Sequence, residues 1–490
     1  MANKVKYLVL LAVFTLFPAG FAGEPENKER EKKKVDFSVD VQVRYRYEYW
    51  QNHPFVWIGL AFPNFGYFSD LAYNSNYINW HLLRSRIGVK ASLDDDKFAY
   101  VQIQDARTFG NDALYGYQGE FGTPDLHNYG EVDNFGITQA YLQVERLWET
   151  PFGLKIGRQF LKYGAEKLVG DDDWSNFGQS FDAVKLLFRQ DYFEGDLFYA
   201  ELWPWYPVGG GIPGISFDFA NVSFFGFHGM AKYHKNHDWS AYIFGYRDGN
   251  LSFPILGGPI LTDPFEAPVI TDTNKTLLWT LGTRVEGEFP FGLGYAGEFA
   301  VQFGDWYQTA ASGFMSEFEV WQEFKKTAGR PYWGVGFTFA SGDDSADGDK
   351  NTLVRLFPSP HSQLGYMDLT GMQNITSFDF KAGISPVEEL SLNGALHLFR
   401  LNEKRDAWYG AYGSPFGVLG LGPLGFGMPG RDSLWTSKDL GSELDLFLKY
   451  KYDGGLWFKG GWSVFFPGKA LDNYAIKTPY WVYLQTGLDF

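Results

Sequence analysis

The stretch "DFSVDVQVRYRYEYW", residues 36–50, alternates between apolar and polar side chains without a break. In a β-strand, successive side chains point to opposite faces, so this stretch predicts a strand with one apolar and one charged face. The apolar parity consists of Phe37, Val39, Val41, Val43, Tyr45, Tyr47 and Tyr49. Which of the two faces meets the protein's own interior decides what the protein does.

The same period-two pattern recurs along the whole chain. Further examples are "KFAYVQIQDAR", "GLGYAGEFAVQFGD" and the C-terminal "YWVYLQTGLDF". Eighteen such segments can be drawn, counting the first. An aromatic share of 19% together with 58 Gly favours strands and turns over helices. The pattern therefore predicts an all-β fold.

The predicted connections alternate between short and long. Short ones include "DDD" at 94–96 and "DGG" at 453–455, and the long ones are 51–76, 108–133, 161–180, 204–222, 249–274, 342–371 and 402–435. Short periplasmic turns alternating with long extracellular loops are typical of antiparallel outer-membrane β-barrels, whose strand number is even. A soluble multi-sheet protein would instead bury its apolar faces against each other, and the chain offers little material for a second layer. We therefore predict a transmembrane barrel of about 18 strands.

The ends of the chain agree with this location. Residues 1–22 have the layout of a cleaved signal peptide, with Lys4 and Lys6 before an apolar run and a small-residue site. Residues 23–35 form a charged, flexible lead-in, and the barrel is expected over 36–490. The terminal strand ending in Phe490 resembles the signal read by the barrel assembly machinery in the outer membrane. The net charge of -16 argues against nucleic acid as a partner, and the absence of Cys excludes disulfides.

With the apolar parity facing lipid, the polar parity lines a lumen. Its basic members include Arg284 and the group Arg44, Arg46, Arg84 and Arg86 on the first two strands. Guanidinium groups attract carboxylates and phosphates, often through two hydrogen bonds at once. The simpler interpretation is that lumen charges of opposite sign pair and stiffen the barrel.

Enzymatic chemistry is not expected. The chain contains no G-x-S-x-G and no H-E-x-x-H motif, and no cofactor is predicted. The acidic stretch "SGDDSADGDKNT" offers Asp343, Asp344, Asp347 and Asp349 for irregular calcium binding. It is not an EF-hand, because its twelfth position is Val354 where a bidentate Glu is needed. The stretch "GDDDWSN", residues 170–176, is a weaker candidate of the same kind.

Several stretches in order resemble the alginate-export family of outer-membrane porins. They include "RSRIGVKASLDDDKFAYVQIQDARTFG", "GLKIGRQFLKYGAEKLVGDDDWSNFGQSFDAVKL" and "LGSELDLFLKYKYDGGLWFKGGWSVFFPG". The resemblance implies an eighteen-stranded barrel with an arginine-lined constriction that passes an anionic polysaccharide. It carries basic positions over to Arg84, Arg107, Arg158 and Lys185. Simple alternation directs Arg107 and Arg158 towards lipid. This conflict is removed if a bulge changes which face the side chains of each strand occupy, or if the residue lies beyond the hydrocarbon.

The sequence thus predicts a porin in the cell outer membrane, in contact with its lipid, for hydrophilic anionic solutes or an alginate-like polysaccharide. Loops 108–133 and 402–435 are expected to fold in as lids. One alternative is a general or phosphate-type diffusion porin. Another is a structural or adhesive barrel whose loops occlude the lumen.

Overall fold

The computed structural model describes residues 35–52, 77–110, 133–202, 222–234, 236–248, 276–306, 309–344, 349–413, 415–416, 435–474 and 476–490. The predicted signal peptide, residues 1–22, lies outside these ranges. In the part of the chain that is described, no helix has the length and apolar character needed to cross a membrane.

Eighteen strands form one continuous antiparallel sheet. They are β1 (Asp36–Gln51), β2 (Tyr77–Asp94), β3 (Lys97–Gly110), β4 (Asp133–Val144), β5 (Phe152–Gln159), β6 (Phe181–Gln190), β7 (Phe193–Leu202), β8 (Val222–His234), β9 (His237–Asp248), β10 (Thr276–Glu288), β11 (Leu293–Trp306), β12 (Thr309–Glu323), β13 (Tyr332–Ala340), β14 (Ile375–Val387), β15 (Leu390–Leu401), β18 (Asp439–Lys451), β19 (Leu456–Pro467) and β20 (Tyr480–Asp489). A separate hairpin, β16 (Trp408–Tyr409) with β17 (Pro415–Phe416), and the 3-10 turns η3 (Leu147–Glu149), η6 (Asp453–Gly455) and η7 (Lys469–Tyr474) complete the described elements.

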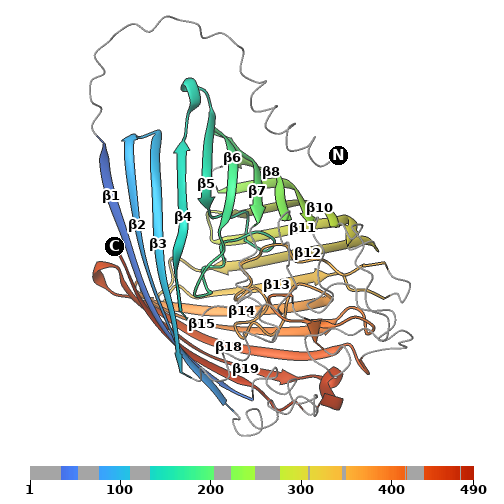
Figure 1. The fold of residues 1–490 in the computed structure, drawn as a ribbon. Coiled ribbons are helices and arrows are strands. Elements are labelled where there is room, and N and C mark those ends of the chain that lie inside the picture. Colours follow the sequence, from blue (N-terminus) through green and yellow to red (C-terminus); the bar gives the residue numbers. More distant parts are fainter. Residues whose placement is uncertain are drawn as a thin grey trace, which may run out of the picture. The chain divides into compact units, whose positions relative to one another are not determined.

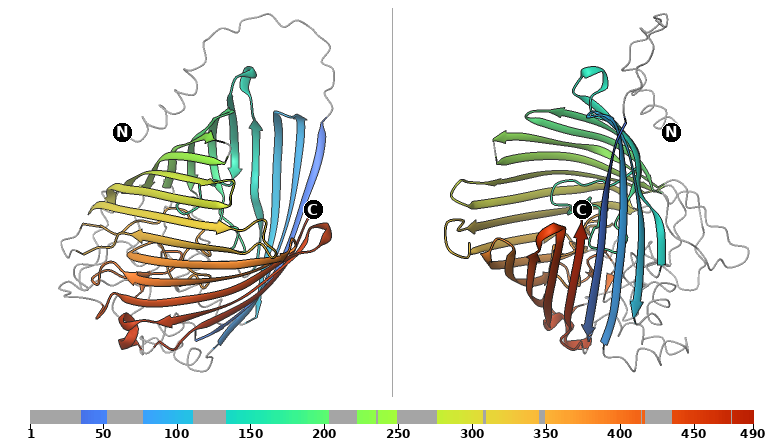
Figure 2. Two further views of the ribbon diagram at one scale, coloured as in Figure 1. Left: turned by 180° about the vertical axis from the view of Figure 1, so that it is seen from behind. Right: turned by 90° about the vertical axis from the view of Figure 1, so that its left-hand side faces the viewer.

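The sheet closes into a barrel because its first and last strands pair. Each strand pairs with its neighbours in sequence, and β1 pairs with β20 from Gln42 opposite Asp489 to Gln51 opposite Tyr480. Phe490 adds a reciprocal pair of backbone hydrogen bonds with Val41, of 2.7 and 3.0 Å. The strands run round the wall from β1 to β19 (Figure 1), and β1 lies beside the C-terminal strand (Figure 2). Closure satisfies the edge groups that lipid would leave unpaired, and it confirms the predicted eighteen-stranded barrel.

The opening strand has the orientation that its pattern predicts. The side chains of Val39, Val43 and Tyr45 are 60%, 38% and 39% exposed, whereas Arg44 and Arg46 on the other parity are buried. On β20, Leu484 is exposed on the outward face while Trp481 and Tyr483 are buried inside. The apolar parity therefore forms the outer, lipid-facing surface, and the polar parity faces the interior.

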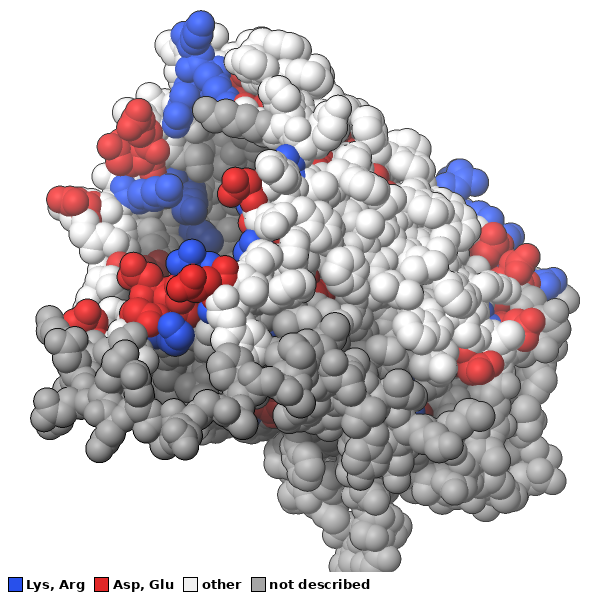
Figure 3. Space-filling model, turned by 90° about the horizontal axis from the view of Figure 1, so that it is seen from above, with Lys and Arg blue, Asp and Glu red and all other residues white. Residues whose placement is uncertain are grey.

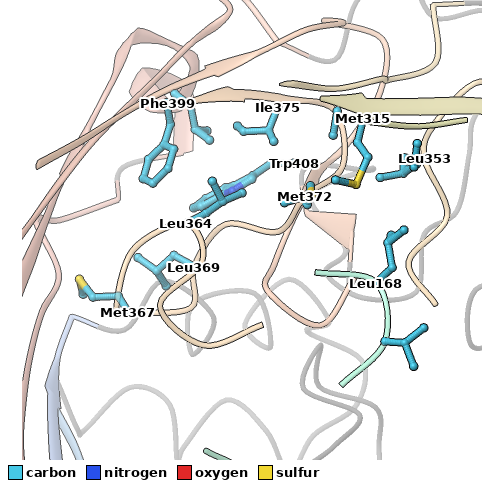
Figure 4. Packing of buried hydrophobic residues seen from close by; sticks show 14 of the residues in the cluster. Leu168, Met315, Leu353, Leu364, Met367, Leu369, Met372, Ile375, Phe399 and Trp408 are labelled. Atoms are coloured by element: carbon cyan, nitrogen blue, oxygen red, sulfur yellow. The ribbon is translucent and has the colours of Figure 1, made fainter. Parts of the chain in front are cut away.

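The interior is filled by inward-folded segments, which we call the plug: residues 160–180, between β5 and β6, and the described parts of 341–374, between β13 and β14. The two segments pair with each other through a parallel bridge between Val169 and Phe357. Their apolar side chains pack against inward residues of the wall, so that Leu168, Leu369 and Met372 lie with Met315 and Phe399 in one buried cluster (Figure 4). The barrel thus encloses a hydrophobic core of its own.

The segments that fold inward are only partly the loops that the sequence predicts as lids. Residues 111–132 of the expected loop 108–133 lie outside the described residues. In the expected loop 402–435, Trp408 is buried in the interior cluster, and the Tyr409 carbonyl accepts a 2.7 Å hydrogen bond from Gly371 of the plug. The two plug segments themselves, which the sequence indicates only as long loops, supply most of the filling.

Candidate functional site

Two neighbouring strands bring the four arginines Arg44, Arg46, Arg84 and Arg86 together on the inward face; we call this group the arginine cluster. In the β1–β2 ladder Arg44 lies directly opposite Arg84, while Arg86 stands opposite Gln42 and Arg46 opposite Leu82. Strand register therefore spaces the guanidinium groups along the barrel wall. Their side chains are at most 5% exposed, so their mutual repulsion has to be offset by close acceptors.

The plug supplies those acceptors. The Asp173 carboxylate lies 2.8 Å from Nη2 of Arg84, 2.7 Å from Nη1 of Arg86 and 3.9 Å from Nη1 of Arg44. Arg44 also donates a 2.7 Å hydrogen bond to the carbonyl of Ser175. One carboxylate and several carbonyl groups thus act as the acceptors of the arginine cluster.

Asp173 differs from its partners in exposure. Its side chain is 49% exposed, whereas the arginines around it are buried. Burial alone would raise the pKa of the Asp173 carboxyl, but the charges of Arg84, Arg44 and Arg86 together hold this pKa below its usual range. Asp173 is therefore ionised at neutral pH and forms the accessible surface of an otherwise covered cluster.

The next residue, Trp174, joins the wall to both plug segments. The guanidinium of Arg46 lies 3.9 Å from the centre of the Trp174 ring, and its Nη1 donates a 2.7 Å hydrogen bond to the Trp174 carbonyl. On the same indole the His361 ring stacks at 3.6 Å between centroids and 4° between planes. Burial, and then the charge of Arg46, lower the pKa of His361 well below its usual value. Arg46 therefore stacks on a neutral aromatic pair.

Lys185 and Arg284 face the interior, each beside carboxylates of the wall. Lys185 Nζ lies 2.8 Å from Asp196, and Arg284 Nη2 lies 2.8 Å from Glu286. A Cβ on Gly164 of the plug would lie 3.1 Å from Cδ of Arg284. These two residues are inward, as the sequence predicts, but the structure does not bring them into the arginine cluster.

Arg107 and Arg158 lie on the outward face, contrary to the pore-lining position that the family resemblance implies. Arg107 pairs with Asp105 at 2.8 Å, on the same parity as the exposed Val101. Arg158 stands opposite Asp182, which is 51% exposed, and pairs with it at 3.8 Å. The bulge between β3 and β4 places its extra residue in β4, and β5 pairs with both neighbours without a register shift. Nothing therefore turns either arginine inward.

The four acidic residues proposed for calcium are not assembled among the described residues. The Asp343 N–H donates a 3.0 Å hydrogen bond to Asp406, the Asp344 carbonyl accepts one of 3.3 Å from Arg405, and Asp349 is exposed. Asp347 lies outside the described residues. Within the described part of the chain, no group of three or more His, Cys, Asp or Glu has the arrangement of a metal site. Calcium binding in this loop stays a prediction.

Sequence reasoning missed the part of "GDDDWSN" in this site. The stretch stood out only as a weak calcium candidate, yet it supplies both Asp173 and Trp174 to the arginine cluster. These contacts join residues 87 and 128 positions apart, so no local pattern indicates them. The only local sign was an unusual density of carboxylates in a predicted loop.

Charged side chains are unevenly distributed over the surface. In Figure 3 a broad wall of the molecule shows few charged side chains, while Lys, Arg, Asp and Glu gather around a hollow and at the margins. An uncharged wall is what a lipid-facing surface requires. Charges of both signs surround the hollow, so its rim is not uniformly basic.

The model of the family described as alginate export matches residues 67–480. The chain belongs to the alginate export family. Membership of this family and the closed barrel of eighteen strands support a channel-type barrel of the outer membrane. No curated protein matches the sequence.

Solved structures show the same fold at low identity. The outer membrane protein OpdK of Pseudomonas aeruginosa is 10% identical, with a TM-score of 0.56 over 93% of this chain and 98% of that one. OccAB2 of Acinetobacter baumannii is 10% identical, with a TM-score of 0.52 over 92% and 98%. OccK11 of P. aeruginosa is 11% identical, with a TM-score of 0.51 over 93% and 96%. These neighbours support the barrel and say nothing of its cargo.

Proposed function

We propose that this alginate-export barrel passes hydrophilic anionic solutes, of the carboxylated polysaccharide class, across the outer membrane. The observation that carries the proposal is the set of Arg44, Arg84 and Arg86 around the single carboxylate of Asp173. Asp173 is part of the chain and stands where a solute carboxylate would bind. A passing anion would replace it by exchanging one carboxylate for another on the same guanidinium groups.

The mechanism is electrostatic and involves no bond chemistry. The arginine cluster lies on the wall formed by β1 and β2, and the plug covers it from the lumen. Guanidinium groups at low dielectric favour anions strongly over cations. For this preference to act, the passing anion has to displace the Asp173 carboxylate from the arginine cluster. The plug then acts as a movable competitor that sets how readily the cluster is reached.

The test is ion selectivity in planar bilayers. The double variant Arg44→Ala, Arg84→Ala should lose most of the anion preference seen in the reversal potential, while single-channel currents persist. Arg107→Ala is the matched control, because it removes the same charge from the outward face. Unchanged selectivity in the double variant, or equal losses in the control, would contradict the proposal.

One observation favours a second candidate function. The plug is held by a buried apolar cluster as well as by ions, and such a core favours a barrel that remains closed and serves as a structural or adhesive element. Absence of any single-channel current, in the wild type and after removal of the plug segments, would support this candidate. Currents with no preference for anions would instead support a general diffusion porin.

We also propose that the chain is exported with residues 1–22 as a cleaved signal peptide and that the barrel assembly machinery inserts it. The exposed terminal Phe490, paired with Val41, supports the second part. Mass spectrometry of the mature protein would identify the cleavage site, and a Phe490 deletion should reduce the amount of assembled barrel.

A further inference from the structure

A chain of buried polar groups crosses three neighbouring strands of the wall and ends on the plug. Asp379 on β14 stands opposite His397 on β15, which stands opposite Glu443 on β18, and Asp445 follows on the same face. Their side chains are between 0% and 5% exposed. Neither the arginine cluster nor the proposed passage of anions uses these residues.

His397 is held between two carboxylates. Its Nδ1 lies 2.7 Å from Asp379, and its Nε2 lies 3.4 Å from Oδ2 of Asp445. Asp379 also accepts a 2.6 Å hydrogen bond from the Ser377 hydroxyl. An imidazole with a carboxylate at each nitrogen is best satisfied with both nitrogens protonated. This arrangement leaves Asp445 facing a cation on one side.

Glu443 and Asp445 have acceptor atoms without donors. Glu443 Oε1 accepts a 2.8 Å hydrogen bond from the Met367 N–H. Among the described residues, Glu443 Oε2 and both oxygens of Asp445 accept no hydrogen bond, apart from the long 3.4 Å contact of Asp445 Oδ2 with His397, although both residues are 0% exposed. Two adjacent buried carboxylates cannot both remain ionised without a large cost. A proton on Glu443 Oε2 resolves both problems, because the resulting hydroxyl donates to Asp445.

The plug rests directly on this pair. Gly365 has φ +91°, and a Cβ there would lie 2.3 Å from Glu443 Oε1. Only a glycine allows the chain to approach the carboxyl group so closely. The plug offers the Glu443 side chain the single N–H of Met367, which suits a neutral acid better than a second buried charge.

Other titratable groups interact with the pair from the wall and from the plug. Besides His397 they are Asp368, Tyr366 and His361 of the plug and Tyr483 of β20. Asp379 acts through His397. His361 bonds to Asp368 at 2.9 Å and belongs to the same surroundings. Any pH response of the plug must therefore be assigned by variants.

We propose that Glu443 holds a proton and, with Asp445 beside it, forms a pH-responsive latch for plug residues 349–374. The plug stays docked while the pair carries one negative charge. When the plug lifts away, water reaches Glu443 and this acid ionises more readily. The undocked state therefore binds fewer protons, and docking weakens as pH rises. The latch proposal concerns the position of the plug, and its test is independent of the test for anion selectivity.

The test uses a spin label on the plug. Because the chain has no Cys, Ser362→Cys gives a single labelling position on an exposed residue of the plug. Label mobility in lipid vesicles should rise as the pH is raised above the range in which exposed carboxyl groups titrate, about pH 4. Glu443→Gln imitates the protonated acid, since its amide accepts from Met367 and donates to Asp445, and should abolish the pH response with the plug docked.

Two further variants make the result decisive. Asp445→Asn leaves one ionisable acid, so the pair can never carry two negative charges, and the response should again be abolished. This variant gives the answer if Glu443→Gln fails to form a heat-resistant barrel. Glu319→Gln is the matched control, because Glu319 pairs with Lys381 on the wall and does not belong to the latch; it should keep the full response. The proposal is overturned if label mobility does not change with pH in the wild type. It is also overturned if the change persists in both latch variants, which is the result expected if His361 causes the response.

Discussion

At the scale of single residues, the arrangement around Asp173 shows how an inward cluster of like charges is kept in a folded barrel. The arginine cluster brings four positive charges together, and Asp173 and Glu48 are its closest carboxylates. Other guanidinium N–H groups donate to neutral carbonyl groups, such as that of Ser175. The cluster is thereby stabilised without being neutralised, and it retains a net positive charge.

The pH behaviour of Asp173 follows from the direction of its pKa. Because the arginines lower this pKa, the attraction of Asp173 to the cluster is complete above the ordinary carboxyl pKa of about 3.9 and is lost only as pH falls through the lower folded value. Asp173→Asn should shift selectivity further towards anions. The difference in reversal potential between wild type and variant should stay constant from about pH 7 down to about pH 4.

Asp182→Asn, on the outward face beside Arg158, is the control for this measurement. It makes the same chemical change outside the lumen and should leave selectivity as it is. The contrary result is that the reversal potentials of the wild type and of Asp173→Asn become equal near the ordinary carboxyl pKa. That result would show that the arginines do not hold Asp173 ionised.

At the scale of elements, the plug behaves as a second folded unit built from two segments far apart in sequence. Segment 160–180 is fixed to β1 and β2 through the arginine cluster, and segment 341–374 is fixed to β18 through Glu443. Backbone hydrogen bonds join the two segments, including Gly170 N–H to the Phe357 carbonyl at 2.7 Å. Movement of one segment is therefore coupled to the other.

The apolar contacts of the plug make a quantitative prediction. Leu369 is fully buried in the interior cluster, so Leu369→Ala should weaken plug docking by about 2–5 kcal/mol through lost burial and a residual cavity. Hydrogen exchange of residues 341–374 should become faster while exchange of the barrel strands is unchanged. Leu446→Ala, on the lipid-facing side of β18, removes the same atoms without touching the plug. Equal plug protection in both variants would contradict the packing described here.

At the scale of the whole molecule, the barrel is a boundary between two solvents. Its outward parity is apolar in the middle of the strands, as at Leu281 between Ile243 and Val301, and becomes polar towards the loop ends, as at Leu277 between Arg247 and Asp305. The outward pairs Arg107 with Asp105 and Arg158 with Asp182 stand on the loop side of Val101 and Ile156. Charge is therefore graded along the outer face.

This gradient predicts a position-dependent cost for a charge. Leu281→Arg should destabilise the barrel in lipid by about 2–4 kcal/mol, whereas Leu277→Arg should cost about 0–1 kcal/mol, because the charge lies nearer the headgroups. The two leucines are on one strand, and each is 38% exposed. Chemical unfolding in vesicles measures the difference. Equal losses of unfolding free energy in the two variants would contradict this gradient. They would mean that the edge of the hydrocarbon does not lie between Leu281 and Leu277.

The barrel could be read from the sequence, and the plug could not. Alternation in β1 predicted that Val43 faces lipid and Arg44 the lumen, because strand geometry alone separates neighbouring side chains. The same rule placed Arg107 and Arg158 on the outer face, where they lie; the family resemblance placed them inside, where they do not. The local rule succeeded because the extra residue of the nearby bulge belongs to β4 rather than to β3.

What the sequence determined by itself is the closed barrel, the identity of its two faces and the presence of four inward arginines on adjoining strands. These follow from period-two geometry and from the need to pair every backbone group in lipid. Only the tertiary structure decided that Arg44 stands opposite Arg84, that Asp173 occupies the cluster, and that Glu443 supports the plug at Gly365. Such contacts depend on strand register and on loops that return from distant parts of the chain, and no periodic pattern encodes either of them.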